Sequence, residues 1–244
     1  MARAPDARGG ASRLVSVKAV SDGYPLRGAL RVGAGPGTPP ADTQSAPAPG
    51  TAWVDTAVLE ALGLGPAHVA GLSWGGTVVL ELYRHHPEHV ATLILVDSYA
   101  GWKGSLPEAE VRARVAGMRE ALAAPAAEFD PTLPGLFAAG PPPEFAGLME
   151  EMAAAVRPGS VRTQLSVMAG ADQRDLLPRI AAPTLLIWGE ADVRSPLGVA
   201  RQFEEAIPDT TLVVLPGAGH LTNLERPGAF NDAVRAFCRA HPPS

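Results

Sequence analysis

Cysteine, long apolar runs and surplus positive charge are all scarce in this sequence of 244 residues. Cys238 is the only cysteine, which excludes an internal disulfide, and its place in an expected helix favours a packing role over a catalytic thiol. The longest strongly apolar run, residues 92–96, is too short to span a membrane. Residues 1–10 include basic side chains with no apolar stretch behind them, so we expect no signal peptide and a cytoplasmic location.

Two further absences restrict the partners and cofactors. The chain has 20 Lys and Arg against 25 Asp and Glu, a net charge of −5, whereas nucleic-acid binding needs a basic surface. No Walker or dinucleotide-binding pattern occurs, so we predict no nucleotide and no other cofactor. A small, uncharged substrate is therefore expected, with neither nucleic acid nor membrane as a partner.

The first 66 residues differ in character from the rest of the chain. Glycine, proline and small polar residues dominate them. Residues 14–20 and 26–32 show strand patterns, and residues 51–64 show a helical one. Residues 33–50 are too poor in apolar side chains to order themselves, which predicts a loop or linker. We treat residues 1–66 as an atypical N-terminal segment.

From residue 67 the pattern becomes regular. Short apolar segments that read as strands alternate with amphipathic segments that read as helices, which predicts an α/β fold with a mostly parallel sheet. The expected strands are 68–72, 92–96, 184–188 and 211–215, and the expected helices are 75–85, 197–206 and 226–239. Residues 107–175 are predicted to be mostly helical, and residues 103–175 are expected to form a cap over a core made of residues 67–102 and 176–244.

A serine lies in the turn between the first of these strands and the helix that follows it. Residues 71–76 read Gly-Leu-Ser-Trp-Gly-Gly, a match to G-x-S-x-G in the strand-to-helix context that a nucleophile elbow requires. Side chains in place of the flanking glycines would clash in this tight, strained turn. The following helix directs its N-terminus at Ser73, where it favours developing negative charge. Ser73 is therefore the candidate nucleophile.

A serine hydroxyl needs a base, and that base needs an orienting carboxylate. His220 follows a strand in the glycine-rich turn 216–220, and Asp192 follows another strand. The chain order Ser, Asp, His is the order of α/β-hydrolases. Glu190 and Asp97 remain alternatives to Asp192, although Asp97 equally suits a structural role in its turn.

Residues 67–240 resemble an α/β-hydrolase of the esterase, lactonase and haloperoxidase-like superfamily. The resemblance rests on the serine turn together with three further stretches, at 93–97, 188–192 and 219–227. It implies a triad of Ser73, Asp192 and His220 and an acyl-enzyme mechanism. The Trp74 backbone N–H, next to the nucleophile, is then one oxyanion donor.

The N-terminal segment departs from this superfamily. No His-Gly pair, which usually supplies the second oxyanion donor, occurs in the chain, and too few strands precede residue 51. A backbone N–H in residues 33–37 is a substitute suggested by composition alone. Residues 13–65 are instead similar, over residues 21–28 and 49–55, to an extracytoplasmic segment of FtsX- or MacB-type permeases. Truncated or replaced strands would leave an open sheet edge, so we expect a homo-oligomer.

Apolar residues of the expected cap could line a substrate pocket or simply pack against one another. The pocket candidates are Trp74, Trp102, Met149 and Leu221. Residues 85–89, His-His-Pro-Glu-His, fit no standard zinc spacing, which favours a solvated turn; we expect no metal site.

Together these features predict a cofactor-free serine esterase or lactonase that acts on small apolar esters. Two alternatives remain open. A weakened hydrolase scaffold could act as a binding or assembly module, because one oxyanion donor is missing. Perhydrolysis or cofactor-free halogenation would use the same triad.

Overall fold

The computed structural model describes most of the chain from residue 66 onward. The described residues are 66–123, 134–145, 147, 149, 151 and 158–243, with short segments at 2–3, 12–13, 30–32 and 41–43. The contacts within the chain define two compact units, Met1–Pro66 and Ala67–Ser244. Each unit is considered by itself.

The first unit contains two short antiparallel strand pairs. β1 (Ala2–Arg3) pairs with β2 (Ser12–Arg13), and β3 (Leu30–Val32) pairs with β4 (Ala41–Thr43). β3 coincides with the end of the strand expected over residues 26–32. β4 falls inside the expected loop, because pairing with β3 satisfies backbone groups whatever the side-chain pattern. The strand expected over 14–20 and the helix expected over 51–64 lie outside the described residues.

The second unit contains a parallel sheet. Its strands are β5 (Ala67–Leu72), β6 (Val90–Val96), β7 (Thr184–Gly189) and β8 (Thr210–Leu215), in the spatial order β5-β6-β7-β8. Every neighbouring pair is parallel, so all four carboxyl ends lie at one edge. These strands match the expected ones to within two residues, and the mostly parallel sheet is confirmed.

Helices connect the strands. They are α2 (Trp74–His85), α3 (Trp102–Ser105), α4 (Glu108–Ala123), α6 (Pro158–Gly170), α7 (Leu197–Ala206), α8 (Thr222–Glu225) and α9 (Pro227–Ala240), with 3-10 turns η2 (Pro87–His89), η4 (Pro143–Phe145) and η5 (Leu177–Arg179). α2, α7 and α9 correspond to the expected helices. α3 and α8 were not expected, because four residues are too few to show a helical period.

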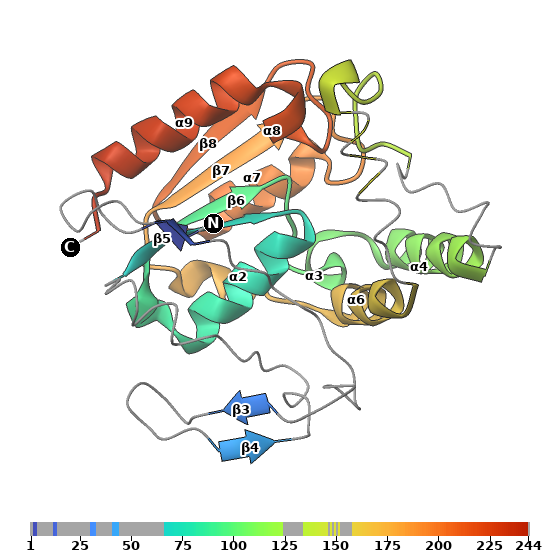
Figure 1. Cartoon of the computed structure of the whole chain (residues 1–244), viewed down its shortest axis with the longest axis horizontal. Helices are drawn as coiled ribbons and strands as arrows, with labels where there is room; N and C mark the ends of the chain where they lie inside the picture. The colour runs from blue at the N-terminus through green and yellow to red at the C-terminus, as the bar shows by residue number, and fades with distance from the viewer. Residues whose placement is uncertain are drawn as a thin grey trace. The chain divides into compact units, whose positions relative to one another are not determined.

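The sheet is covered on both faces (Figure 1). Alternate residues of β6 and β7 point to opposite sides, which separates the core into two clusters. Leu93 and Leu186 pack on the side of α2 and α7, where Leu80 and Phe203 are fully or almost fully buried. Ile94 and Leu185 pack on the side of α9, against Phe237. Burial on both faces explains why β6 and β7 read as continuous apolar runs.

The helices between β6 and β7 form a separate group. α4 and α6 lie side by side, and both contact α3 (Figure 1). These helices belong to residues 103–175, the expected cap, whose covering role stays a prediction. Within the described part of the chain no helix combines the length and apolar character needed to cross a membrane. Among the same residues β5 is an edge strand that pairs only with β6. The homo-oligomer expected from an open sheet edge stays a prediction.

Candidate active site

Ser73 lies at the sharp turn between β5 and α2. Its backbone has φ 52° and ψ −118°, a conformation that residues other than glycine rarely adopt. The turn is held because the Ser73 N–H donates to the Val96 carbonyl at 2.8 Å, and the Gly76 N–H donates to the Ser73 carbonyl at 3.0 Å. Strain of this kind costs about 1–3 kcal/mol and persists at functional sites.

Two of the three glycines around Ser73 are required by close packing. A Cβ on Gly71 would lie 2.3 Å from the Gly75 carbonyl oxygen, and a Cβ on Gly76 would lie 1.4 Å from Ser98 Oγ. A Cβ on Gly75 would meet nothing within 4 Å. The expectation that both flanking glycines prevent a clash is therefore right for Gly71 and wrong for Gly75.

Ser73, His220 and Asp192 form one hydrogen-bonded chain. His220 Nε2 is 2.8 Å from Ser73 Oγ, and His220 Nδ1 is 2.8 Å from Asp192 Oδ2. A carboxylate can only accept, so a neutral His220 carries its proton on Nδ1 and accepts from the serine hydroxyl through Nε2. The residues that carry the imidazole and the carboxylate are both buried: His220 is 2% exposed and Asp192 is 5% exposed.

The second oxygen of Asp192 is also occupied. Asp192 Oδ1 accepts the backbone N–H groups of Arg194 at 2.7 Å and Ser195 at 3.0 Å. These bonds fix the carboxylate toward His220. Glu190, the nearby alternative, is exposed and accepts the Gly217 N–H at 3.1 Å, so it does not contact His220 in this arrangement.

Backbone contacts join the loop that follows β7 to the loop that follows β8. The Glu190 N–H donates to the Leu215 carbonyl at 3.1 Å, and the Ala191 N–H donates to the Ala218 carbonyl at 2.9 Å. A Cβ on Gly189 would lie 2.1 Å from the Gly219 carbonyl oxygen, so only glycine allows this approach. The two loops that carry Asp192 and His220 are thus held against each other.

Asp97, directly after β6, joins that strand to the end of β7 and the start of α8. Its side chain is fully buried, and its two oxygens accept the Gly189 N–H at 2.8 Å and the Thr222 hydroxyl at 2.7 Å. The pKa of Asp97 is raised to about 8, mainly by burial and also by the Asp192 charge, whereas the hydrogen bonds from Gly189 and Thr222 act in the opposite direction. Asp97 does not contact His220 here; the geometry matches the structural alternative that the sequence left open.

Glu225 is a supporting residue that the sequence analysis did not identify. Its two carboxylate oxygens accept the Gly219 N–H at 2.6 Å and the Ala138 N–H at 2.9 Å. It therefore connects the residue before His220 to the segment after α4. Its position five residues after His220, at the end of α8, was the available signal, but a lone glutamate in a turn does not indicate a role by itself.

The four expected pocket residues have different surroundings. Trp74 begins α2 beside Ser73, where the first N–H groups of a helix have no intrahelical partner. Trp102 is 3% exposed and packs edge-on against Tyr99, with the Arg114 guanidinium 5.6 Å from its ring centre. Met149 is buried. Leu221, next to His220, donates its N–H to the Leu136 carbonyl at 3.0 Å. A substrate role for each stays a prediction.

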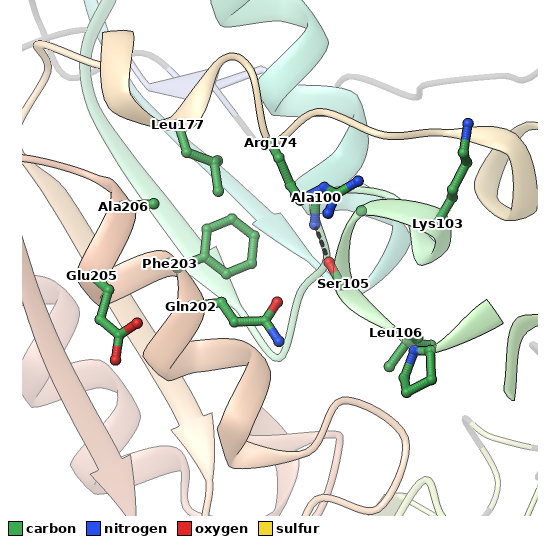
Figure 2. Close-up of a pocket in the computed structure, with 12 residues that line it drawn as sticks. Ala100, Lys103, Ser105, Leu106, Arg174, Leu177, Gln202, Phe203, Glu205 and Ala206 are labelled. Carbon is green, nitrogen blue, oxygen red and sulfur yellow. Dashed lines mark hydrogen bonds between the residues drawn. The ribbon is translucent and has the colours of Figure 1, made fainter. Parts of the chain in front are cut away.

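A surface pocket of about 550 Å³ lies on another part of the same unit (Figure 2). Leu177 and Phe203 form part of its apolar wall, and Lys103 and Arg174 supply charge on one side. None of Ser73, His220 and Asp192 lines it, so this pocket is separate from the hydrogen-bonded chain.

Comparison with known proteins gives concordant matches. A family model for the alpha/beta hydrolase fold matches residues 32–227. A thermophilic esterase from Thermogutta terrifontis is 32% identical, with a TM-score of 0.60 over 77% of this chain and 71% of that one. A hydrolase from Pseudomonas aeruginosa is 31% identical, with a TM-score of 0.59 over 75% and 68% of the two chains.

A curated relative is similar over a shorter stretch. The pimeloyl-(acyl-carrier protein) methyl ester esterase of Pectobacterium atrosepticum is 34% identical over 76 residues, which cover 31% of this chain and 30% of that protein. The chain covers only 26–31% of the length of the first curated relatives that it matches.

The resemblance of residues 13–65 to a permease segment is not borne out. The hydrolase match begins at residue 32, inside that segment. The resemblance rested on two short stretches rich in glycine and proline, a composition shared by many unrelated turns. With a family model covering most of its length and a parallel sheet that carries a serine turn at one strand end, the chain belongs to the α/β-hydrolase fold family.

Proposed function

We propose that this protein is a serine hydrolase that cleaves carboxylic esters through an acyl-enzyme. The observation that carries the proposal is the chain of two 2.8 Å hydrogen bonds from Ser73 through His220 to Asp192. A nucleophile within hydrogen-bond reach of a base that is itself oriented by a carboxylate is the arrangement that activates a serine.

In the first half of the reaction, Ser73 Oγ attacks the ester carbonyl while His220 Nε2 takes its proton. Asp192 keeps the other ring nitrogen protonated and stabilises the imidazolium that forms. When the tetrahedral intermediate collapses, His220 gives the proton to the leaving alcohol, and the acyl group remains on Ser73.

In the second half, a water molecule replaces the alcohol. His220 takes a proton from that water, which attacks the acyl carbonyl, and then returns the proton to Ser73 Oγ as the carboxylic acid departs. The reaction written in this way needs no cofactor, because the His220 imidazole carries the proton in every step.

Oxyanion stabilisation comes in part from the start of α2. The Trp74 N–H follows the nucleophile, and the helix dipole places partial positive charge at the same end. A single lost donor typically costs about 2.7–4 kcal/mol of transition-state stabilisation. The suggested second donor, within residues 33–37, lies outside the described residues.

A small, apolar acyl group is the substrate class that we infer. The net charge of −5 disfavours anionic polymers, and the relatives named as esterases support ester chemistry. We assign Trp74, the residue after the nucleophile, to the contact with this acyl group, because an aromatic side chain suits an apolar ligand.

Hydrolysis of p-nitrophenyl esters, from acetate to dodecanoate, tests the proposal. Ser73→Ala should abolish turnover, whereas Ser166→Ala, which alters an exposed serine on α6, should leave it unchanged. The acyl chain length with the highest kcat/KM indicates the length of the pocket that binds the acyl group.

Labelling by a fluorophosphonate provides the decisive second measurement, because only an activated serine reacts. Wild type and Ser166→Ala should be labelled and Ser73→Ala should not. A folded wild type that neither turns over any ester nor takes up the label would overturn the proposal and favour a binding scaffold.

A further inference from the structure

The turn between α2 and β6 brings together three metal-ligating side chains. His86 directly follows α2, Glu88 and His89 belong to the 3-10 turn η2, and β6 begins at the next residue. One ligand atom from each of the three lies within 4.8 Å of the other two. The sequence spacing matched no standard zinc pattern, so only the folded turn shows this grouping.

The distances within the group suit a tetrahedral transition metal. Glu88 Oε1 is 3.5 Å from His86 Nδ1 and 3.5 Å from His89 Nε2. Two ligands bound to tetrahedral Zn²⁺ at about 2.0–2.2 Å lie roughly 3.3–3.6 Å apart. The two distances from Glu88 to the histidines therefore already have the required length. Rotation of the partly exposed imidazoles can shorten the third distance, between His86 and His89.

The backbone of the turn is fixed before any ion arrives. The His86 N–H donates to the Leu82 carbonyl at 2.8 Å, and the His89 N–H donates to the His86 carbonyl at 3.1 Å. Pro87 restricts the backbone between them. A preformed turn lowers the entropy cost of gathering the ligands.

The ligand set also restricts the kind of ion. Two imidazoles and one carboxylate suit Zn²⁺, Ni²⁺ or Cu²⁺, whereas Ca²⁺ and Mg²⁺ prefer oxygen ligands alone. The three side chains are between 42% and 60% exposed, so a fourth position is open to water.

We propose that His86, Glu88 and His89 form a surface site for a divalent transition-metal ion, with Zn²⁺ as the test ion. The site is remote from the reaction. Ser73 precedes α2 and His86 follows it, so the 12 residues of the helix separate them by about 18 Å. An ion held here would join the end of α2 to the start of β6.

Zinc binding by the full-length protein, with any affinity tag removed, tests this site. Zn²⁺ is titrated in competition with a chromophoric chelator, and wild type should bind one equivalent. Glu88→Gln and His89→Gln should each weaken binding at least tenfold. His85→Gln is the matched control: it removes a neighbouring exposed histidine that contacts Glu81 instead, and it should bind as wild type does.

Two controls keep the result specific. All three exposed-residue variants should retain the wild-type circular dichroism spectrum and ester turnover measured without zinc. Mg²⁺ at the same concentration should not compete. The proposal is overturned if wild type binds no zinc, if Glu88→Gln and His89→Gln bind as wild type does, or if His85→Gln weakens binding equally.

Discussion

The contact between Gly76 and Ser98 gives a quantitative test of how the serine turn is built. An added Cβ at residue 76 would lie 1.4 Å from Ser98 Oγ and 2.5 Å from Ser98 Cβ, and the next atom, the Gly71 carbonyl oxygen, would be 3.7 Å away. Rotation of the hydroxyl relieves only the first overlap. Gly76→Ala should therefore lower the free energy of unfolding by about 1–3 kcal/mol, the usual cost of overpacking.

The second variant removes the obstacle. Ser98→Gly deletes both overlapping atoms and leaves alanine at residue 76 in ordinary contact with its surroundings. By itself Ser98→Gly should cost about 0.5–1.5 kcal/mol for the hydrogen bond that Ser98 Oγ donates to the Ser73 carbonyl at 3.0 Å. In Gly76→Ala the new Cβ already displaces the Ser98 hydroxyl, so the double variant loses no further hydrogen bond and gains relief of the overlap; it should be more stable than Gly76→Ala.

Urea unfolding of all four proteins measures the coupling between the two residues. The expected coupling energy is about 1–3 kcal/mol in favour of the double variant. The reasoning about close packing fails if Gly76→Ala unfolds at the wild-type urea concentration, or if the double variant is no more stable than Gly76→Ala.

Two further predictions concern the buried carboxylates. Asp192→Asn should reduce ester turnover by about 10⁴-fold, as the corresponding change does in serine proteases, whereas Glu190→Gln should stay close to wild type. Equal losses of kcat/KM in the two variants would show that Asp192 is not the carboxylate that orients His220. Asp97, with a pKa near 8 against an ordinary 3.8, keeps a proton that the unfolded chain has lost. Wild type should thus lose stability as pH rises from about 4 to 8, and Asp97→Asn, which cannot ionise, should become more stable relative to it; urea unfolding at several pH values would contradict this if the difference stayed constant.

The regular part of the fold was predictable because its signals are local. β6 and β7 are apolar on both faces, so each shows as a short apolar run. Ser73, Asp192 and His220 lie in turns that follow the strands β5, β7 and β8, respectively. Parallel strands end at one edge of the sheet, so three distant residues could be expected to meet there.

Other features depend on packing that no local pattern contains. The sequence did not indicate the burial of Trp102 or its contacts with Tyr99 and Arg114, because the fold brings these side chains together; its role in a pocket stays a prediction. The role of Asp97 likewise depends on Gly189 and Thr222, which are 92 and 125 residues away in the chain. Such contacts become visible only when the strands are placed side by side.

The joined loops after β7 and β8 have a consequence for motion. Asp192 and His220 sit on backbone segments that are hydrogen-bonded to each other, with Gly189 and Gly219 in close contact between them. A fluctuation that opens one loop must therefore break the bonds to the other, so the acid and the base lose order in the same opening event. In hydrogen exchange, the Glu190 and Ala191 amides should therefore share one protection factor, because both of their hydrogen bonds break when the two loops separate.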